Sequence, residues 1–230
     1  MIPIAASSGD AEYTLRELAV PLDLGSFVPS ARAWEVELGF GKGRYLLHRA
    51  ECEPDRGFVG VEMAGSYYRL AKRRMCRREL TNAVLLHGEA LYLLSVVLPR
   101  GFASTVHVYF PDPWPKARHQ KRRLFDIETI DLVLDLMTDE GRLFFATDFL
   151  EYGEVVREIL DSFPLLRVID VDGASFQNAG STLAEELAFT MAMASEYMAI
   201  LTSRGIGAND AARSMLLSMA PGPESVWEIA

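Results

Sequence analysis

Short apolar segments alternate with helical patterns from residue 34 onward, and this alternation restricts the fold more than any other feature of the sequence. The apolar segments are rich in β-branched and aromatic side chains, which is typical of buried strands. We expect strands over residues 34–38, 57–61, 83–86, 105–110, 142–146 and 165–169, and helices over residues 44–50, 64–78, 90–98, 124–137 and 152–162. Strands that alternate with helices in this way form βαβ units. The sequence therefore predicts an α/β fold with a mostly parallel central sheet and helices on both faces.

The length of 230 residues suits one domain with short additions at its ends. We predict an N-terminal extension over residues 1–33, a main domain over residues 34–205 and a C-terminal tail of uncertain order over residues 206–230. A helical pattern rich in alanine and methionine covers residues 183–201, near the end of the main domain. These patterns are compatible with a monomer or a homodimer, and they indicate no obligatory protein partner.

Apolar runs and cysteines bear on the compartment of the protein. No apolar run is long enough to form a transmembrane helix, so we expect no membrane association. The first residues lack the basic and apolar segments of a secretory signal. Cys52 and Cys76 do not have the spacing of metal ligands, and we interpret them as reduced thiols. We therefore expect a cytoplasmic protein without a bound metal.

The net charge of −9, taken as a whole, opposes nucleic-acid binding, but the charges are unevenly distributed. Residues 149–230 hold twelve acidic side chains, four arginines and no lysine, so residues 1–148 are close to neutral. Affinity for a polyanion depends on local phosphate neutralisation rather than on total charge. Two basic clusters occur in the neutral part: Arg69, Lys72, Arg73, Arg74, Arg77 and Arg78 form the first, and Lys116, Arg118, Lys121, Arg122 and Arg123 form the second. The acidic total therefore does not exclude an RNA partner.

A glycine-rich segment, Gly39-Phe-Gly-Lys-Gly43, follows the first expected strand and precedes a helix. Glycine has no Cβ and tolerates positive φ, so such a loop lets the backbone approach a ligand closely. The spacing differs from the GxGxxG fingerprint of dinucleotide sites. Glu37 lies just before the loop, where a carboxylate would repel a pyrophosphate but would suit an ammonium group. The loop alone is a weak signal, because similar loops also bind phosphates or no ligand.

Acidic residues stand at the ends of three successive expected strands. Glu37 closes the first strand, Glu62 follows the second and Glu89 follows the third, although each of them alone could be a solvated loop residue. Ligands of parallel α/β sheets bind at the carboxyl ends of the strands, so these carboxylates and the glycine loop are expected at one site. S-adenosylmethionine carries a sulfonium and an ammonium, and it fits this set better than a nucleotide diphosphate does. We expect Glu62 to meet the ribose hydroxyls and Glu89 to meet the adenine edge.

A proline-rich loop, Phe110-Pro-Asp-Pro-Trp-Pro115, follows the fourth expected strand. Its three prolines restrict φ and remove three backbone donors, which fixes Asp112 and Trp114 at the strand end. One interpretation is that the prolines and the tryptophan only brace the loop. The second basic cluster and His119 follow directly, however, and next to a methyl-donor site they favour contact with an RNA backbone over a solvated helix face.

These segments resemble the ordered motifs of bacterial tRNA (guanine-N7-)-methyltransferases. The resemblance covers residues 34–170, and its most specific part is the string from Phe110 to Arg123, FPDPWPKARHQKRR. Matching shorter motifs are Glu37 to Gly43, Gly60 to Met63, Glu89-Ala90 and Thr147-Asp148. The resemblance implies a Rossmann-like class I methyltransferase fold. It also implies transfer of a methyl group from S-adenosylmethionine to N7 of a guanosine in tRNA, conventionally position 46 in the variable loop.

The resemblance further implies roles for individual residues, and no metal. The residues expected at the methyl donor are Glu37, Gly39, Glu62, Glu89 and Asp112, of which Asp112 is also the expected catalytic residue. The residues expected at the target nucleotide are Lys116, Asp148 and, from a late motif, Ser195. The residues expected to bind tRNA are Arg118, His119, Lys121, Arg122 and Arg123.

Two positions depart from the family pattern. Glu89 stands where the family usually has an aspartate, which lengthens the side chain by one methylene. The late substrate motif, T-x-[FY]-E, is matched by Ser195 to Met198, where Met198 replaces the glutamate; Thr182 with Glu185 is the alternative match. This second departure concerns guanine recognition and not the donor site. It leaves open a catalytically silent RNA-binding protein with this fold, while the basic loop argues against a methyltransferase that acts on a small molecule rather than on RNA.

Overall fold

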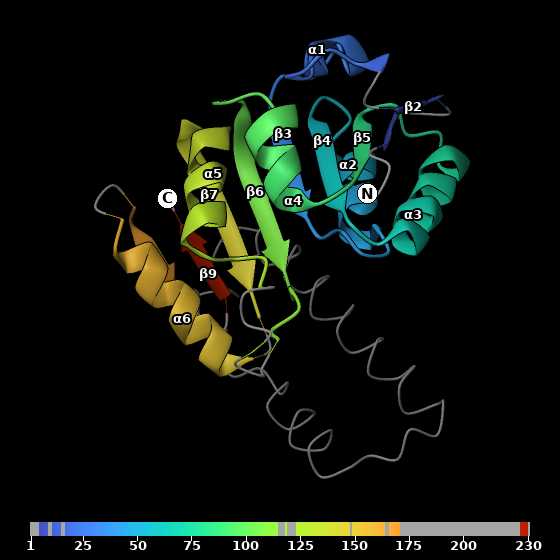
Figure 1. Ribbon diagram of the computed structural model, residues 1–230. Coiled ribbons are helices and arrows are strands. Elements are labelled where there is room, and N and C mark those ends of the chain that lie inside the picture. Colours follow the sequence, from blue (N-terminus) through green and yellow to red (C-terminus); the bar gives the residue numbers. More distant parts are fainter. Residues whose placement is uncertain are drawn as a thin grey trace, which may run out of the picture.

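The computed structural model describes residues 5–8, 11–14, 17–114, 118, 123–147, 149–163, 166–170 and 226–229. One nine-stranded sheet runs through these residues, in the order β2-β1-β5-β4-β3-β6-β7-β9-β8 (Figure 1). Its strands are β1 Ala5–Ser8, β2 Ala11–Thr14, β3 Trp34–Leu38, β4 Gly57–Glu62, β5 Ala83–His87, β6 Ala103–Tyr109, β7 Met137–Ala146, β8 Val168–Asp170 and β9 Val226–Ile229.

Five neighbouring strands, from β5 through β4, β3 and β6 to β7, are parallel and form the centre of the sheet. The chain starts this centre at β3, moves outward through β4 and β5, and then returns to the other side of β3 to add β6 and β7. In doubly wound sheets, ligands bind at the carboxyl ends of the strands where the direction reverses. The topology therefore confirms the mostly parallel sheet and directs attention to the carboxyl ends of β3 and its neighbours.

Antiparallel strands extend both edges of this parallel centre. The hairpin of β1 and β2 pairs with β5 at one edge, and β9 inserts between β7 and β8 at the other. These strands come from residues 1–33 and 206–230, where the sequence shows no alternating pattern. Parts of the predicted extension and tail thus belong to the sheet, while the division into domains at residues 33 and 205 stays a prediction.

Helices cover both faces of the sheet, as the sequence predicts (Figure 1). On one face, α2 Arg44–Cys52 and α3 Gly65–Arg77 bury side chains such as Leu46 and Met75 against Phe58 and Leu85. The other face carries the larger apolar core. The helices that contribute to this core are α1 Leu24–Phe27, α4 Ala90–Tyr92, the π-helical turn η2 Leu93–Val97, α5 Ile127–Leu136 and α6 Leu150–Asp161.

Several element bounds differ from those expected, and local chemistry explains two of them. Helix α5 begins at Ile127 rather than at residue 124, because the Asp126 carboxylate accepts a hydrogen bond from the Thr129 N–H at 3.0 Å and caps the helix. Strand β7 continues through Gly141 instead of starting after it. A Cβ at Gly141 would lie 2.9 Å from the Met137 Cβ, so the close backbone approach needs glycine. The helix expected over residues 183–201 lies outside the described residues.

Two general properties concern the described part of the chain alone. None of its helices combines the length and the hydropathy that crossing a bilayer requires. No group of three or more His, Cys, Asp or Glu side chains in this part could hold a metal ion.

Candidate functional site

The glycine loop leaves β3 in a conformation that other residues rarely adopt. Gly39, Gly41 and Gly43 have φ values of +76°, +51° and +66°. A Cβ at Gly43 would lie 2.7 Å from the Ala71 Cβ, so glycine here also lets α2 begin directly against α3. No described atom lies within 4 Å of the position that a Gly39 Cβ would take. The loop is therefore closely packed beneath Gly43 and open above Gly39, as a ligand-contacting loop should be.

The carboxylate of Glu62 ties this loop to the end of β4. Its Oε2 accepts a hydrogen bond from the Gly41 N–H at 2.7 Å, and its Oε1 accepts one from the Ala64 N–H at 2.7 Å. The side chain is only 9% exposed. Each carboxylate oxygen has a second lone pair, so both remain able to accept from a ligand hydroxyl. Glu62 thus fixes the loop and keeps acceptors at the strand ends.

Glu37 is a buried carboxyl beside the same loop. Its side chain is 5% exposed, and its Oε2 accepts a hydrogen bond from the Leu46 N–H at 3.1 Å. Burial raises the pKa of Glu37 to about 8; the Leu46 hydrogen bond opposes this rise and the neighbouring charge of Glu62 adds to it. Because a nearby cation would stabilise the ionised form, the position favours a positively charged ligand group.

Glu89 and Asp112 stand at the ends of the two strands that flank this pair. Glu89 is exposed at the start of α4, and the N–H of its neighbour Gly88 donates to the Glu62 carbonyl at 3.0 Å, which holds the ends of β5 and β4 together. Asp112 is also exposed, in the loop after β6. The flanking residues Phe110 and Trp114 have φ values of +49° and +40°, a strained conformation for bulky side chains. Such strain concentrates at functional loops.

Arg123 anchors the proline-rich loop to the fold. Its Nε donates to the Pro113 carbonyl at 2.8 Å, and its guanidinium lies 4.7 Å from the centre of the Tyr152 ring. Arg118, in contrast, is exposed. The role of both arginines in RNA binding stays a prediction, but Arg123 already has partners within the chain.

The remaining predicted site residues cannot be placed, because they lie outside the described residues: Lys116, His119, Lys121, Arg122, Asp148 and Ser195. The structure does place the end of β7, which leads to Asp148, beside the loop that carries Asp112. The N–H of Phe110 donates to the Ala146 carbonyl at 2.8 Å. Of the residues expected at the methyl donor, Glu62 contacts the glycine loop directly, and Glu37 acts on Glu62 through its charge.

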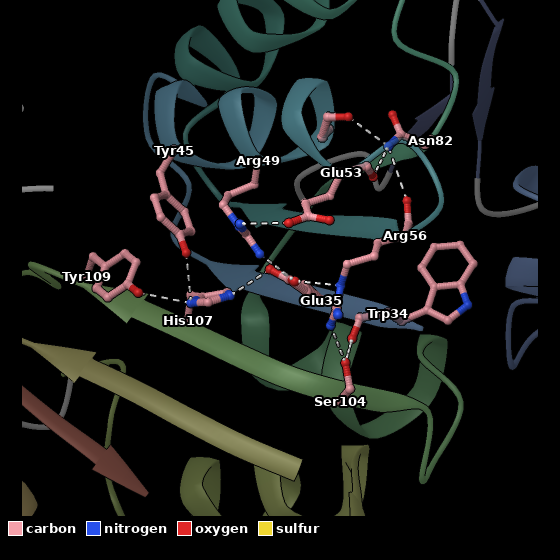
Figure 2. Close-up of polar contacts among 11 residues, drawn as sticks. Trp34, Glu35, Tyr45, Arg49, Glu53, Arg56, Asn82, Ser104, His107 and Tyr109 are labelled. Carbon is pink, nitrogen blue, oxygen red and sulfur yellow. Dashed lines mark hydrogen bonds and ion pairs between the residues drawn. The ribbon is translucent and has the colours of Figure 1, made fainter. Parts of the chain in front are cut away.

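A buried polar network lies on the same face of the sheet, beneath α2 (Figure 2). Its centre is Glu35, whose Oε1 lies 2.9 Å from Arg49 Nη2 and 2.8 Å from Arg56 Nε, the second as an ion pair without hydrogen-bond alignment. Its Oε2 lies 3.1 Å from Nε2 of His107 on β6. Burial alone would raise the pKa of Glu35, but His107 and Arg49 lower it to about 2. Glu35 is therefore a carboxylate at neutral pH.

His107 connects this network to both halves of the candidate site. Its Nδ1 lies 2.9 Å from the Tyr109 hydroxyl, at the end of β6, and 3.3 Å from the hydroxyl of Tyr45, in the first turn of α2 (Figure 2). The two tyrosine rings also meet edge to face, with centroids 4.9 Å apart. The network thus joins the helix that follows the glycine loop to the strand that precedes the Asp112 loop.

The sequence interpretation missed this network, although two signals point to it. Glu35 and Glu37 occupy alternate positions of one apolar strand, so both face the same side of the sheet. His107 interrupts an otherwise apolar strand two positions before Tyr109. Buried polar residues need partners, and polar residues on adjacent central strands are candidates for one another.

The parallel centre, the reversal of strand order at β3 and the glycine loop define a Rossmann-like class I methyltransferase fold. The solved antibiotic-resistance methyltransferase Kmr has this fold too: it shares a TM-score of 0.51 and 20% identity with the chain, over 73% of this chain and 91% of that one. At that identity the likeness concerns the fold alone.

Sequence comparisons give the family. Residues 31–195 match the family model described as "Putative methyltransferase". A tRNA (guanine-N(7)-)-methyltransferase of Leifsonia xyli subsp. xyli is 35% identical over 153 residues, which are 66% of this chain and 67% of that protein. Its namesake in Nitrosococcus oceani is 32% identical over 157 residues, 68% of this chain and 66% of that protein. The chain therefore belongs to the tRNA (guanine-N7-)-methyltransferase family, and it matches about two thirds of the length of these relatives.

Proposed function

We propose that the chain transfers a methyl group from S-adenosylmethionine to N7 of a guanosine in tRNA, with position 46 of the variable loop as the expected target. The observation that carries this proposal is the anchored glycine loop. Glu62 holds its backbone from below, the space above Gly39 is open, and the buried Glu37 favours a cation beside it. The membership in the family supplies the reaction and the kind of RNA.

The donor set suits S-adenosylmethionine chemically. Glu37 would face the ammonium group, Glu62 would accept from the ribose hydroxyls, and Glu89 would lie at the adenine edge. All three stand at the ends of adjacent parallel strands. A nucleotide diphosphate would instead meet two carboxylates close to the glycine loop and would be repelled. When bound, S-adenosylmethionine supplies an electrophilic methyl group on a positively charged sulfur.

The reaction needs little acid–base chemistry from the protein. The N7 lone pair of guanine attacks the methyl carbon, the bond from that carbon to sulfur breaks, and the positive charge moves to the guanine ring without proton transfer. The contribution of the chain is therefore alignment, worth up to about 7–11 kcal/mol in favourable cases. The Asp112 carboxylate would stabilise the charge that develops on the ring. Lys116, Asp148 and Ser195 would position the nucleotide, and the basic residues Arg118, His119, Lys121, Arg122 and Arg123 would hold the RNA backbone.

We expect the protein to act in the cytoplasm as a monomer or a homodimer. Radiolabelled donor incubated with the purified chain and unmodified tRNA should label the RNA. Asp112→Asn should lower the turnover far more than the affinity for tRNA, because a charge that forms only in the transition state is lost. Equal losses in both would leave Asp112 a binding role only. Donor binding without any transfer to RNA would favour a catalytically silent RNA-binding protein, or another acceptor.

A further inference from the structure

Helix α3 carries a concentration of positive charge that the proposed reaction does not use. Its residues and the next one include six cations and no acidic side chain, in a chain whose net charge is −9. Arg69, Arg73 and Arg77 lie four residues apart and are exposed. That spacing places them about 6 Å apart along one side of the helix, as a continuous stripe. We name these three residues the α3 stripe.

The α3 stripe is not neutralised by the part of the chain that the structure describes. Among those residues, none of the three arginines has a carboxylate within ion-pair distance, and Arg77 Nε donates only to the Arg73 carbonyl, at 3.4 Å. Like charges four residues apart destabilise a helix by about 0.2–0.5 kcal/mol per pair. Burial and the neighbouring Arg44, Arg78 and Arg77 also lower the pKa of Arg74, which reflects the same crowding of cations.

Helix stability does not account for the whole stripe. Cations in the last turn, such as Arg77, interact favourably with the carbonyl end of the helix dipole. Arg69, however, lies in the N-terminal half of α3, where the dipole disfavours a cation. The apolar side of the helix, with Tyr68, Ala71 and Met75, is buried against the sheet. It is therefore unavailable for insertion into a membrane, which basic amphipathic helices use when they bind lipid.

The position of α3 links the stripe to the candidate site. Arg74 Nη1 donates to the Lys42 carbonyl in the glycine loop at 2.8 Å. A Cβ at Gly43 would touch Ala71, so the middle of α3 packs on the same loop. Figure 1 shows α3 at the side of the sheet beyond β4 and β5, away from β7 and α6. A polyanion that reaches the donor loop could continue along α3.

We propose that the α3 stripe is a second RNA-binding surface, which holds the phosphate backbone of the tRNA beside the glycine loop while the loop after β6 holds it near Asp112. This inference rests on the proposed function, because it assumes that tRNA reaches the strand ends. An elongated RNA needs contacts on both sides of the reacting base to fix its direction. Arginine suits this task, since its planar fork binds phosphate oxygens.

The test compares two triple variants with equal charge changes. The stripe variant is R69Q/R73Q/R77Q, and the control is R32Q/R100Q/R157Q, which removes three charges from other elements. The affinity for unmodified tRNA is measured between 50 and 200 mM salt, and donor affinity is measured by calorimetry. Each phosphate contact contributes about one unit to the slope of log affinity against log salt. The affinity of the wild type should therefore fall about 50-fold more over this range than that of the stripe variant.

The control variant should keep the wild-type slope, R69K/R73K/R77K should restore it, and donor affinity should be unchanged in all variants. An unchanged slope in the stripe variant, or an equal loss in the control, overturns the inference. Loss of binding to anionic lipid vesicles with an unchanged tRNA slope would do the same and would identify a membrane surface. Failure of the proposed function is distinct: the wild type would then transfer no methyl group to tRNA, whatever the salt slopes.

Discussion

Glu37 is the residue through which pH should control the folding stability of this chain. The pKa of its buried carboxyl is about 8 in the folded chain, against an ordinary value of 4.5. Because the folded pKa is raised, the folded state holds an extra proton between these values, and the free energy of unfolding falls as the pH rises through this window. The full difference is about 5 kcal/mol above pH 8, and about 3 kcal/mol of it is reached at pH 7.

The variant Glu37→Gln separates this charge from the rest of the side chain, because glutamine keeps an oxygen that can accept from the Leu46 N–H. Denaturant unfolding should show similar stabilities for wild type and variant near pH 4.5. The variant should then gain on the wild type, up to about 5 kcal/mol at pH 9. Glu154→Gln, an exposed position on α6, is the matched control and should follow the wild type. Parallel curves for wild type and Glu37→Gln would refute the reasoning.

The same residue should couple donor binding to proton release. An ammonium group beside Glu37 favours the ionised carboxylate, so binding at pH 7 should release nearly one proton from the mostly protonated ligand-free chain. Titration calorimetry in two buffers with different ionisation enthalpies measures this number. Glu37→Gln should bind S-adenosylmethionine more weakly and release no proton from this position. A wild type that binds the donor without proton release would contradict the assignment of Glu37 to the ammonium group.

Further predictions concern the supporting residues. Gly43→Ala should lower the free energy of unfolding by about 1–3 kcal/mol in denaturant titrations, because alanine there has a positive φ and its Cβ meets Ala71 at 2.7 Å. Glu35→Gln should cost about 3–5 kcal/mol at pH 7, since it leaves buried arginines unpaired. The wild type should lose that advantage as the pH falls from 4.5 towards 2, because the pKa of Glu35 is lowered. Arg118→Gln should weaken tRNA binding in filter assays with unchanged stability, whereas Arg123→Gln should also lower the melting temperature, because Arg123 holds the Pro113 carbonyl. Unchanged stability in the Gly43, Glu35 or Arg123 variant would contradict its reason.

The sequence predicts the parallel centre of the fold well, because buried parallel strands read as continuous apolar segments between helices. It also predicts the positions of the glycine loop, Glu37 and Glu62, since residues after successive strands meet at one edge of the sheet. The edge strands are harder to predict. β1, β2 and β9 are short, and β9 pairs with strands far away in the sequence, so no local pattern reveals it.

The buried network illustrates a second limit. Glu35, His107 and Tyr45 come from three separate elements, and only the register of β3 against β6 brings the first two together. Sequence reasoning sees three isolated polar residues at positions that favour apolar ones. Arg123 gives the opposite case, because the sequence groups it with the basic run while the structure shows it bound to Pro113 and Tyr152. In both cases tertiary packing decides which partner a polar group finds.

The central claim, methyl transfer to guanine N7 in tRNA, is tested most directly by mapping the modified nucleotide. The purified chain is incubated with S-adenosylmethionine and an unmodified tRNA transcript, and the product is analysed by mass spectrometry after nuclease digestion. A second transcript, with adenosine in place of the variable-loop guanosine at position 46, is treated in the same way. The account predicts one N7-methylguanosine, at that position, in the first transcript and none in the second. Equal modification of both transcripts, or a methyl group on another atom, would contradict it.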